Sequence, residues 1–530
     1  MFGDEAGAAN LSDRIGNLVR TEAETSGGRR RLTGMTAVEA PPLAWEPLPA
    51  AEWDAEAAAH LLRRTGWSAP PAEVARARDE GLSRTLERLF PAQPILCPEP
   101  PKVVKLKADA PELARGLAAA DPAELRQKRR EARERTQDTL QEMSIRWLQF
   151  AARPENAAFA KWTLFLGDVY VVSAEKVKNA ALVWQHSDLI ARHSLGAAPD
   201  LAKAMSRSPA MVNYLDLNQS RRDAPNENFA RELFELFLLG EGHYAESDIK
   251  EAARAFTGYR QQLGEFRFAP RQHDAGPKTI FGRTGPFAGD DVIDLAYGQK
   301  AAAAFLPREL TKFYLGEQAL PAADLAEIGD FWRSTGFNLR ALARRFFGSR
   351  IFFDPSFRGT FIKSPIQFYL GLMQDLHLDV PPLPRQVLPP FRQMGQMLYY
   401  PPNVRGWVGG RSWINSATLA ARRRVVEACF APLREDLLNA DEQAELAAAR
   451  NEGMKNFSVG DSALGPFEAL DSAAAADRLA ANFLALPASA EFRAHVRTFL
   501  GDDHVDPARR RQRLRRAAVI LLQSPEYQLC

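Results

Sequence analysis

The chain has 530 residues, and its 68 lysines and arginines nearly balance 66 aspartates and glutamates, which leaves a formal charge of +2. This balance argues against a dedicated nucleic-acid-binding protein, which usually carries a basic excess. Three cysteines cannot build a disulfide framework, and no stretch approaches the roughly 20 apolar residues that span a bilayer. We therefore expect a globular protein with no membrane span and no nucleic-acid partner.

The two ends of the chain differ from its middle. Residues 1–40 are rich in Gly, Ala and charge, which predicts a flexible leader. They contain no apolar segment typical of a signal peptide, which favours the cytoplasm for the sequence as given. We expect a helical core domain over residues 41–440 and a C-terminal helical segment over 441–530 that packs on this core.

Helical periodicity dominates the remaining sequence, and strand-like alternation is scarce. The predicted fold class is therefore mainly α: a large multi-helix architecture in a single unit, with long irregular loops and little or no sheet. In chain order the predicted elements are helices at 55–64 and 83–90, a proline-rich linker at 94–103, a long charged helix or helix pair at 111–150, helices at 156–206, an irregular stretch with a short hairpin at 265–295, helices at 298–376, and a second irregular stretch at 379–415.

The most informative segment is a predicted helix at 226–240. Asp223 or Asn226 caps its start, and Gly240 or Gly242 ends it. Apolar residues occupy nearly all of its sides, so we expect it to be buried. It nevertheless carries four charged side chains, those of Glu227, Arg231, Glu232 and Glu235.

Buried carboxylates need partners, because an unpaired buried charge costs several kcal/mol. Glu232 and Glu235 would raise the pKa of at least one of the pair, and a raised carboxyl pKa suits a general acid near neutral pH. The same pair suits a divalent cation, or an ion-pair network that only locks helices together. Arg231 is expected to neutralise one carboxylate, and Arg254 in the next helix is expected to reach back to this one.

Two loops carry further candidates. His273 and Asp274 precede Lys278 in a Gly- and Pro-rich loop, where they fit a general base and the group that orients it. The alternative is a turn in which Asp274 caps the backbone. Trp407 and Trp413 belong to an aromatic loop that suits stacking against sugar rings, or that plugs the core from outside.

Several motifs, in the same order, resemble the bacterial "domain of unknown function 1800" family over roughly residues 55–530. The acidic helix carries the main signature, Asn226–Glu235, with Tyr244, Glu246–Asp248 and Ala252–Gly258 after it. The other similar segments are His60–Gly66 (HLLRRTG), Ser208–Asp216 (SPAMVNYLD), Gln272–Gly282 (QHDAGPKTIFG), Lys363–Pro365, Pro401–Trp407 (PPNVRGW) with Trp413, and Ser524–Gln528.

The resemblance implies a largely helical protein in a single unit and brings no characterised reaction with it. Members often carry export signals, so the resemblance implies a periplasmic or secreted location. They often neighbour sulfatase-like or phosphatase-like proteins, which suggests polymer processing and a sulfatase-like partner. The family commonly has a Phe-Trp-His-Asn-His-Phe type motif, and Gly167 and Val169 stand here where its two histidines would be. This departure weakens the expectation of a metal cofactor, which such a histidine pair would imply. Asp168 remains as a candidate ligand.

Two hypotheses for function follow. The first is a hydrolase or lyase that acts on a carbohydrate-like polymer, and it predicts one cleft shared by the acidic helix, the His-Asp loop and Trp407. The second is a non-catalytic binding or scaffold protein that has lost the family's metal site. In the first hypothesis the catalytic residues are Glu232, Glu235, His273 and Asp274, and the substrate-binding residues are Asn228, Arg231, Arg254, Lys278, Trp407 and Trp413.

Overall fold

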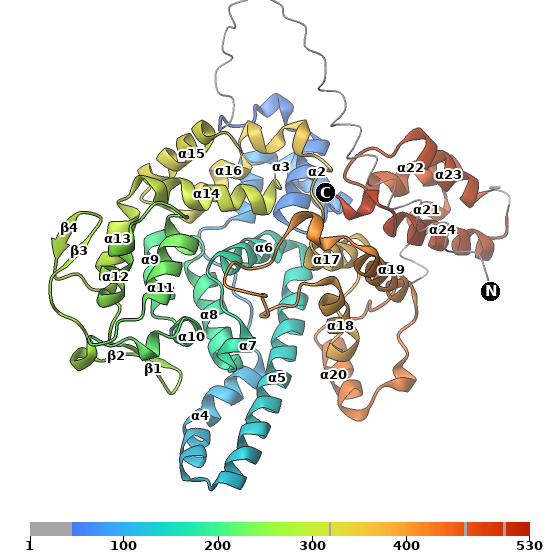
Figure 1. The fold of residues 1–530 in the computed structure, drawn as a ribbon. Coiled ribbons are helices and arrows are strands. Elements are labelled where there is room, and N and C mark those ends of the chain that lie inside the picture. Colours follow the sequence, from blue (N-terminus) through green and yellow to red (C-terminus); the bar gives the residue numbers. More distant parts are fainter. Residues whose placement is uncertain (1–44, 317–319, 461–463, 502–504) are drawn as a thin grey trace, which may run out of the picture. The chain divides into compact units, whose positions relative to one another are not determined.

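The computed structural model describes residues 45–530 apart from 317–319, 461–463 and 502–504. The leader predicted at residues 1–40 lies outside the described residues. The described chain is mainly helical, as predicted, and its strands form two antiparallel sheets of two strands each (Figure 1). Among the described helices, none is both long enough and apolar enough to cross a membrane.

Helices before the acidic segment begin at prolines or at short polar caps. Asp54, for example, accepts the backbone N–H of Ala57 at 2.8 Å and so satisfies one of the free donors of a first helical turn. The charged segment predicted at 111–150 as one long helix or a helix pair forms two helices, α4 and α5, which lie side by side (Figure 1), and α4 begins earlier than predicted, at Pro101. The helices are α2 (Ala55–Thr65), α3 (Pro71–Leu89), α4 (Pro101–Ala119), α5 (Pro122–Ala152), α6 (Pro154–Val169), α7 (Ala174–Val177), α8 (Ala180–His193), α9 (Ala198–Ser206) and α10 (Pro209–Tyr214).

The middle of the chain contains the acidic helix and all four strands. The irregular stretch predicted at 265–295 forms β2, β3 and β4, so it contributes to two hairpins rather than to one. The elements are α11 (Glu227–Glu232), a π-helical turn (Leu233–Leu238), α12 (Glu246–Ala255), β1 (Tyr259–Gln262), β2 (Glu265–Phe268), β3 (Lys278–Ile280), β4 (Arg283–Gly285), α13 (Gly289–Tyr297), α14 (Lys300–Tyr314), α15 (Ala322–Ser334) and α16 (Leu339–Phe347).

The last part of the chain is again helical. The stretch predicted to be irregular at 379–415 contains one helix, α18, followed by an extended loop. The helices are α17 (Pro365–Asp375), α18 (Pro384–Met394), α19 (Ser416–Phe430), α20 (Ala440–Asn451), α21 (Gly465–Glu468), α22 (Ser472–Phe483), α23 (Ala490–Leu500) and α24 (Pro507–Leu522).

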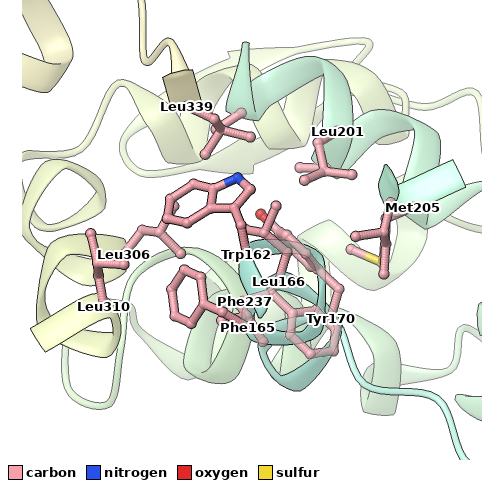
Figure 2. Packing of buried hydrophobic residues seen from close by; sticks show 14 of the residues in the cluster. Trp162, Phe165, Leu166, Tyr170, Leu201, Met205, Phe237, Leu306, Leu310 and Leu339 are labelled. Carbon is pink, nitrogen blue, oxygen red and sulfur yellow. The ribbon is translucent and has the colours of Figure 1, made fainter. Parts of the chain in front are cut away.

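Helix α6 contributes to both large hydrophobic cores. Its Trp162 lies in the first core, where the indole N–H donates to Ser194 O at 2.8 Å (Figure 2). In the same core Tyr170, just after α6, packs against Phe237 of the π-helical turn, with 5.9 Å between ring centroids. Ala160, on the other side of α6, belongs to the second core. Helix α6 is therefore held by both cores, which fixes the position of Gly167 and Asp168 near its end.

The second core joins residues on both sides of the predicted boundary at 440. It includes residues of α17, α18 and α19 together with residues of α22 and α24. The chain end is tied back by main-chain hydrogen bonds, from Lys363 N to Gln528 O and from Cys530 N to Phe361 O, each 2.8 Å. The buried Arg422 also donates to Lys363 O at 2.7 Å. The motifs at 363–365 and 524–528 thus meet in the fold and serve as a structural tie.

Candidate functional site

The acidic helix changes its winding in the middle. Asn226 caps α11 by accepting the N–H of Asn228, as predicted. After Glu232 the helix widens into the π-helical turn, in which Leu239 N donates to Phe234 O at 2.9 Å. Such turns are rare and often occur at functional sites, because they reposition the side chains around them. Gly240 follows in the left-handed region, with φ of 90°, and ends the helix at one of the two predicted glycines.

Glu235 is held at both carboxylate oxygens. Arg405 donates to its Oε1 at 2.8 Å, and the Tyr244 hydroxyl donates to its Oε2 at 2.7 Å. Arg405 also binds Glu241 at 2.9 Å. Burial and the bond to Glu235 raise the pKa of Tyr244 to about 12, so this hydroxyl remains a donor throughout the neutral range. The carboxylate of Glu235 is thereby fixed in place and in orientation.

The carboxyl of Glu232, unlike that of Glu235, is not held by another side chain among the described residues. Glu232 is half-buried, and in the described part of the chain its carboxyl has neither a hydrogen-bond partner nor an ion-pair partner. Burial raises the pKa of Glu232, and the neighbouring charge of Glu235 raises it further, against the opposing effects of Arg405 and Arg231. The sequence predicted a buried helix, whereas the side chains of Glu232 and Glu235 reach the surface in part. A partly exposed carboxyl with a raised pKa is suited to proton transfer.

The arginines expected to serve the acidic pair are engaged elsewhere. Arg231 forms a two-pronged ion pair with Glu246, at 2.7 and 2.8 Å, and lies 3.6 Å from Glu227. Arg254 does not reach back to the acidic helix, because Asp274 and Glu251 hold it at 2.7 Å each. Glu235 instead forms its ion pair with Arg405, which is far away in the sequence.

The predicted His-Asp pair does not form a base and its orienting group. His273 Nδ1 lies 2.9 Å from Thr257 O, while the Asp274 carboxylate accepts from Arg254 and from Gly276 N. The alternative, in which Asp274 caps a turn, agrees with the last of these bonds. The pKa of Asp274 is held below its usual range, chiefly by the bond from Arg254. These contacts leave Asp274 in a structural role.

Lys278 also differs from its prediction as a substrate-binding residue. It is 1% exposed, and its ammonium donates to Asp274 O at 2.6 Å and to Gly276 O at 3.0 Å. The side chain therefore closes its own loop, and its charge does not face solvent. Burial lowers the pKa of Lys278, which is consistent with an enclosed amine.

A polar groove of about 760 Å³ lies beside the acidic helix. Asn228, a predicted substrate-binding residue, lines it one helical turn before Glu232. Two arginines, Arg221 and Arg260, also line it; burial lowers the pKa of Arg260, and the nearby charge of Arg221 lowers it further. Arg221 is exposed and has no ion-pair partner among the described residues. The other lining residues are Asp216, Asn218, Gln219, Ala224, Pro225, Asn226 and Gln272.

Helix α6 and the loop at 401–407 meet at Asp168. Its carboxylate accepts the backbone N–H of Trp407 at 3.0 Å. Gly406 lies against the same carboxylate with φ of 80°, and a Cβ at this position would overlap Asp168. Burial raises the pKa of Asp168 to about 7, the Trp407 N–H opposes this rise and Glu309 adds to it. Sequence reasoning placed Asp168 as a candidate metal ligand and missed this contact.

The two tryptophans of the aromatic loop have different places. Trp407 lines a cavity together with Gly167, the position at which the resemblance implies a histidine. Trp413 is 6% exposed, so its ring plugs the core, as the alternative interpretation holds. Val169 is buried in the first core. The cavity at Trp407 and the polar groove share no lining residue, so the structure separates Trp407 from Asn228.

The predicted single cleft is therefore not formed as expected. Glu232, Glu235 and His273 line neither the cavity nor the groove, and Trp407 lines only the cavity. Within the described ranges, no group of three or more His, Cys, Asp or Glu side chains is placed to hold a metal ion. The fold instead brings together four residues beside the polar groove. This acidic cluster consists of Glu232, Glu235, Tyr244 and Arg405.

These features define a mainly helical protein with a half-buried acidic cluster beside a polar groove. The chain belongs to the family described as "Protein of unknown function (DUF1800)", whose model matches residues 60–529. Searches of curated proteins and of solved structures found no match.

Proposed function

We propose that the protein is a hydrolase or lyase that acts on an acidic, carbohydrate-like polymer bound in the polar groove. The observation that supports this most is Glu232: a half-buried carboxyl with a raised pKa and with no hydrogen-bond or ion-pair partner among the described residues. A carboxyl of this kind retains its proton closer to neutral pH, and it is free to give that proton to a substrate.

The groove supports the choice of substrate class. The amide side chains of Gln219 and Asn228 line the groove and can hydrogen-bond hydroxyl groups in either direction. Arg221 and Arg260 favour a negative charge, because no carboxylate neutralises Arg221 among the described residues. An acidic sugar polymer presents both kinds of group. These two arginines take the role that the sequence assigned to Arg231 and Arg254.

In the proposed mechanism Glu232 donates its proton to the oxygen of the bond that breaks. Glu235, fixed by Arg405 and Tyr244, keeps a negative charge nearby and so favours the protonated form of Glu232. Hydrolysis and elimination share this protonation of the leaving group. In hydrolysis, water then adds to the carbon that the oxygen leaves; in elimination, the neighbouring ring carbon loses a proton to water and a C=C bond forms. The assay separates them, because elimination leaves an unsaturated sugar whereas hydrolysis does not.

A polymeric substrate fits a location outside the cytoplasm, which the family resemblance also implies. An acidic polymer that carries sulfate esters would in addition be a substrate for a sulfatase-like partner.

The test is to incubate the purified chain with matched acidic and neutral polysaccharides, and to measure new reducing ends and unsaturated products. We expect cleavage of acidic polymers only, with Arg221→Ala raising KM and leaving kcat nearly unchanged. Cleavage of neutral polymers at the same rate would contradict the assignment of the groove. The alternative, a binding or scaffold protein, predicts polymer binding without any new reducing ends.

A further inference from the structure

A second hollow, separate from the acidic cluster and the polar groove, lies between helices α6 and α8 and the chain that leads into the 401–407 loop. Its volume is about 100 Å³. Its walls are mostly aromatic and aliphatic, and include Trp147, Phe150, Trp184 and Leu398. Small-molecule sites commonly combine walls of this kind with a few polar groups that fix the orientation of the ligand.

Two of the residues that line this cavity carry a polar atom without a partner among the described residues. The indole Nε1 of Trp407 and the hydroxyl of Tyr399 are both buried, and neither has a hydrogen-bond partner within the described protein. A buried donor without a partner is costly, and native proteins leave few of them. An indole N–H can only donate, so the group that satisfies Trp407 has to be an acceptor such as a carbonyl or hydroxyl oxygen.

The remaining polar groups of the cavity are already satisfied. His186 uses both ring nitrogens, at 2.9 Å from Ser208 Oγ and 2.8 Å from Tyr170 O, and burial lowers its pKa to about 4. Asp188 is paired with Arg192 at 2.7 Å. No unpaired charge among the described lining residues therefore awaits a counter-ion, which favours an uncharged ligand.

Gly167 gives this cavity part of its free space. It lies in α6 and lines the cavity, and a Cβ built on it would meet no atom within 4 Å. A larger side chain at this position would extend into open space rather than into the backbone. The position therefore allows the cavity to be filled without a clash in the surrounding helix.

We propose that this cavity is a binding site for a small, uncharged, largely apolar molecule whose oxygen accepts hydrogen bonds from Tyr399 and Trp407. The site is independent of the proposed catalytic function, because it shares no lining residue with the groove and contains neither Glu232 nor Glu235.

The test uses cyclohexanone and methylenecyclohexane, which have nearly the same shape and differ in an oxygen replaced by a CH₂ group. Binding to the full chain is measured by isothermal titration calorimetry. We expect Tyr399→Phe and Trp407→Phe each to weaken cyclohexanone binding roughly three- to tenfold, as loss of one hydrogen bond predicts. Neither variant should weaken the binding of methylenecyclohexane, because that probe accepts no hydrogen bond.

Substitutions at Gly167 supply the second arm. Gly167→Leu should abolish binding of both probes, and Gly167→Ala should weaken it while keeping the helix, since alanine is the better helix former. The proposal is overturned if the wild-type chain binds neither probe at millimolar concentration. It is also overturned if the Tyr399 and Trp407 variants weaken both probes equally, or if Gly167→Ala and Gly167→Leu bind as the wild type does.

Discussion

Arg405 and Glu235 are separated by 170 positions in the sequence, yet they form an ion pair of 2.8 Å between the 401–407 loop and the π-helical turn. The next two residues of the loop, Gly406 and Trp407, contact Asp168 at the end of α6. One short loop thus connects the acidic cluster to the helix that both cores share.

Arg405→Ala should lower the free energy of unfolding by about 1 kcal/mol, because Glu235 is only 18% exposed and loses its cation. Arg405→Lys keeps the charge but lacks the planar guanidinium, whose Nη2 donates to both Glu235 and Glu241, so we expect an intermediate loss. Urea denaturation measures both variants. Equal stability of wild type and Arg405→Ala would show that the ion pair does not hold the loop.

Gly406→Ala should be strongly destabilising, by more than about 2 kcal/mol, because the new Cβ overlaps the Asp168 carboxylate and the residue has φ of 80°. Gly242→Ala is the matched control, since Gly242 also has φ of 80° but has no atom within 4 Å of a built Cβ. The difference between their denaturation midpoints isolates the contact with Asp168. If the two variants lose the same stability, the contact is not tight.

Asp168 should make the stability of the protein depend on pH. Its pKa is raised from 3.8 to about 7 in the folded state, so the folded chain keeps a proton that the unfolded chain releases. This contribution is fully present below pH 4 and is lost as the pH rises to about 7. Asp168→Asn still accepts from Trp407 N but does not titrate. In thermal unfolding, the stability of Asp168→Asn relative to the wild type should increase from pH 4 to pH 7. A relative stability that decreases over this range would contradict the raised pKa of Asp168.

Glu232 and Glu235 should respond in opposite ways to the same isosteric change. The raised pKa of Glu232 means that its ionisation opposes folding, so Glu232→Gln should gain stability over the wild type as the pH rises above 4.5. Glu235→Gln weakens the bond with Arg405, so it should be less stable than the wild type at pH 7. Chemical denaturation across pH measures both, and a loss of stability for Glu232→Gln at pH 8 would count against its unpartnered carboxyl.

The family was indicated by the resemblance of motifs spread over residues 55–530. Local patterns in the sequence predicted the helices, the cap at Asn226 and the glycine end of the acidic helix. These follow from helical periodicity and turn chemistry within about ten residues. The partners of the charged residues could not be predicted in this way, because they depend on which distant loop lies beside the helix. Arg254 is nearer to Glu235 in the sequence than Arg405 is, but the fold of the His-Asp loop gives Arg254 to Asp274 instead.

The π-helical turn and the cavity were likewise outside the reach of the sequence. An ordinary helical wheel for 226–240 puts Asn228, Glu232 and Glu235 on one flank of a helix that was expected to be buried, whereas the structure leaves both carboxylates partly exposed and widens the helix after Glu232. The cavity at Trp407 depends on free space around Gly167, which only the packing of α6 and α8 reveals.

The most direct test of the central claim compares Glu232→Gln with Glu227→Gln on an acidic polysaccharide that the wild-type chain cleaves. Glu227 belongs to the same helix but lies 3.6 Å from Arg231 and outside the acidic cluster, so its variant controls for the loss of one carboxylate. We predict that Glu232→Gln lowers kcat at least about 100-fold, the usual contribution of a general acid, and that Glu227→Gln stays near the wild-type rate. Cleavage by Glu232→Gln at the wild-type rate would contradict the proposed role of Glu232.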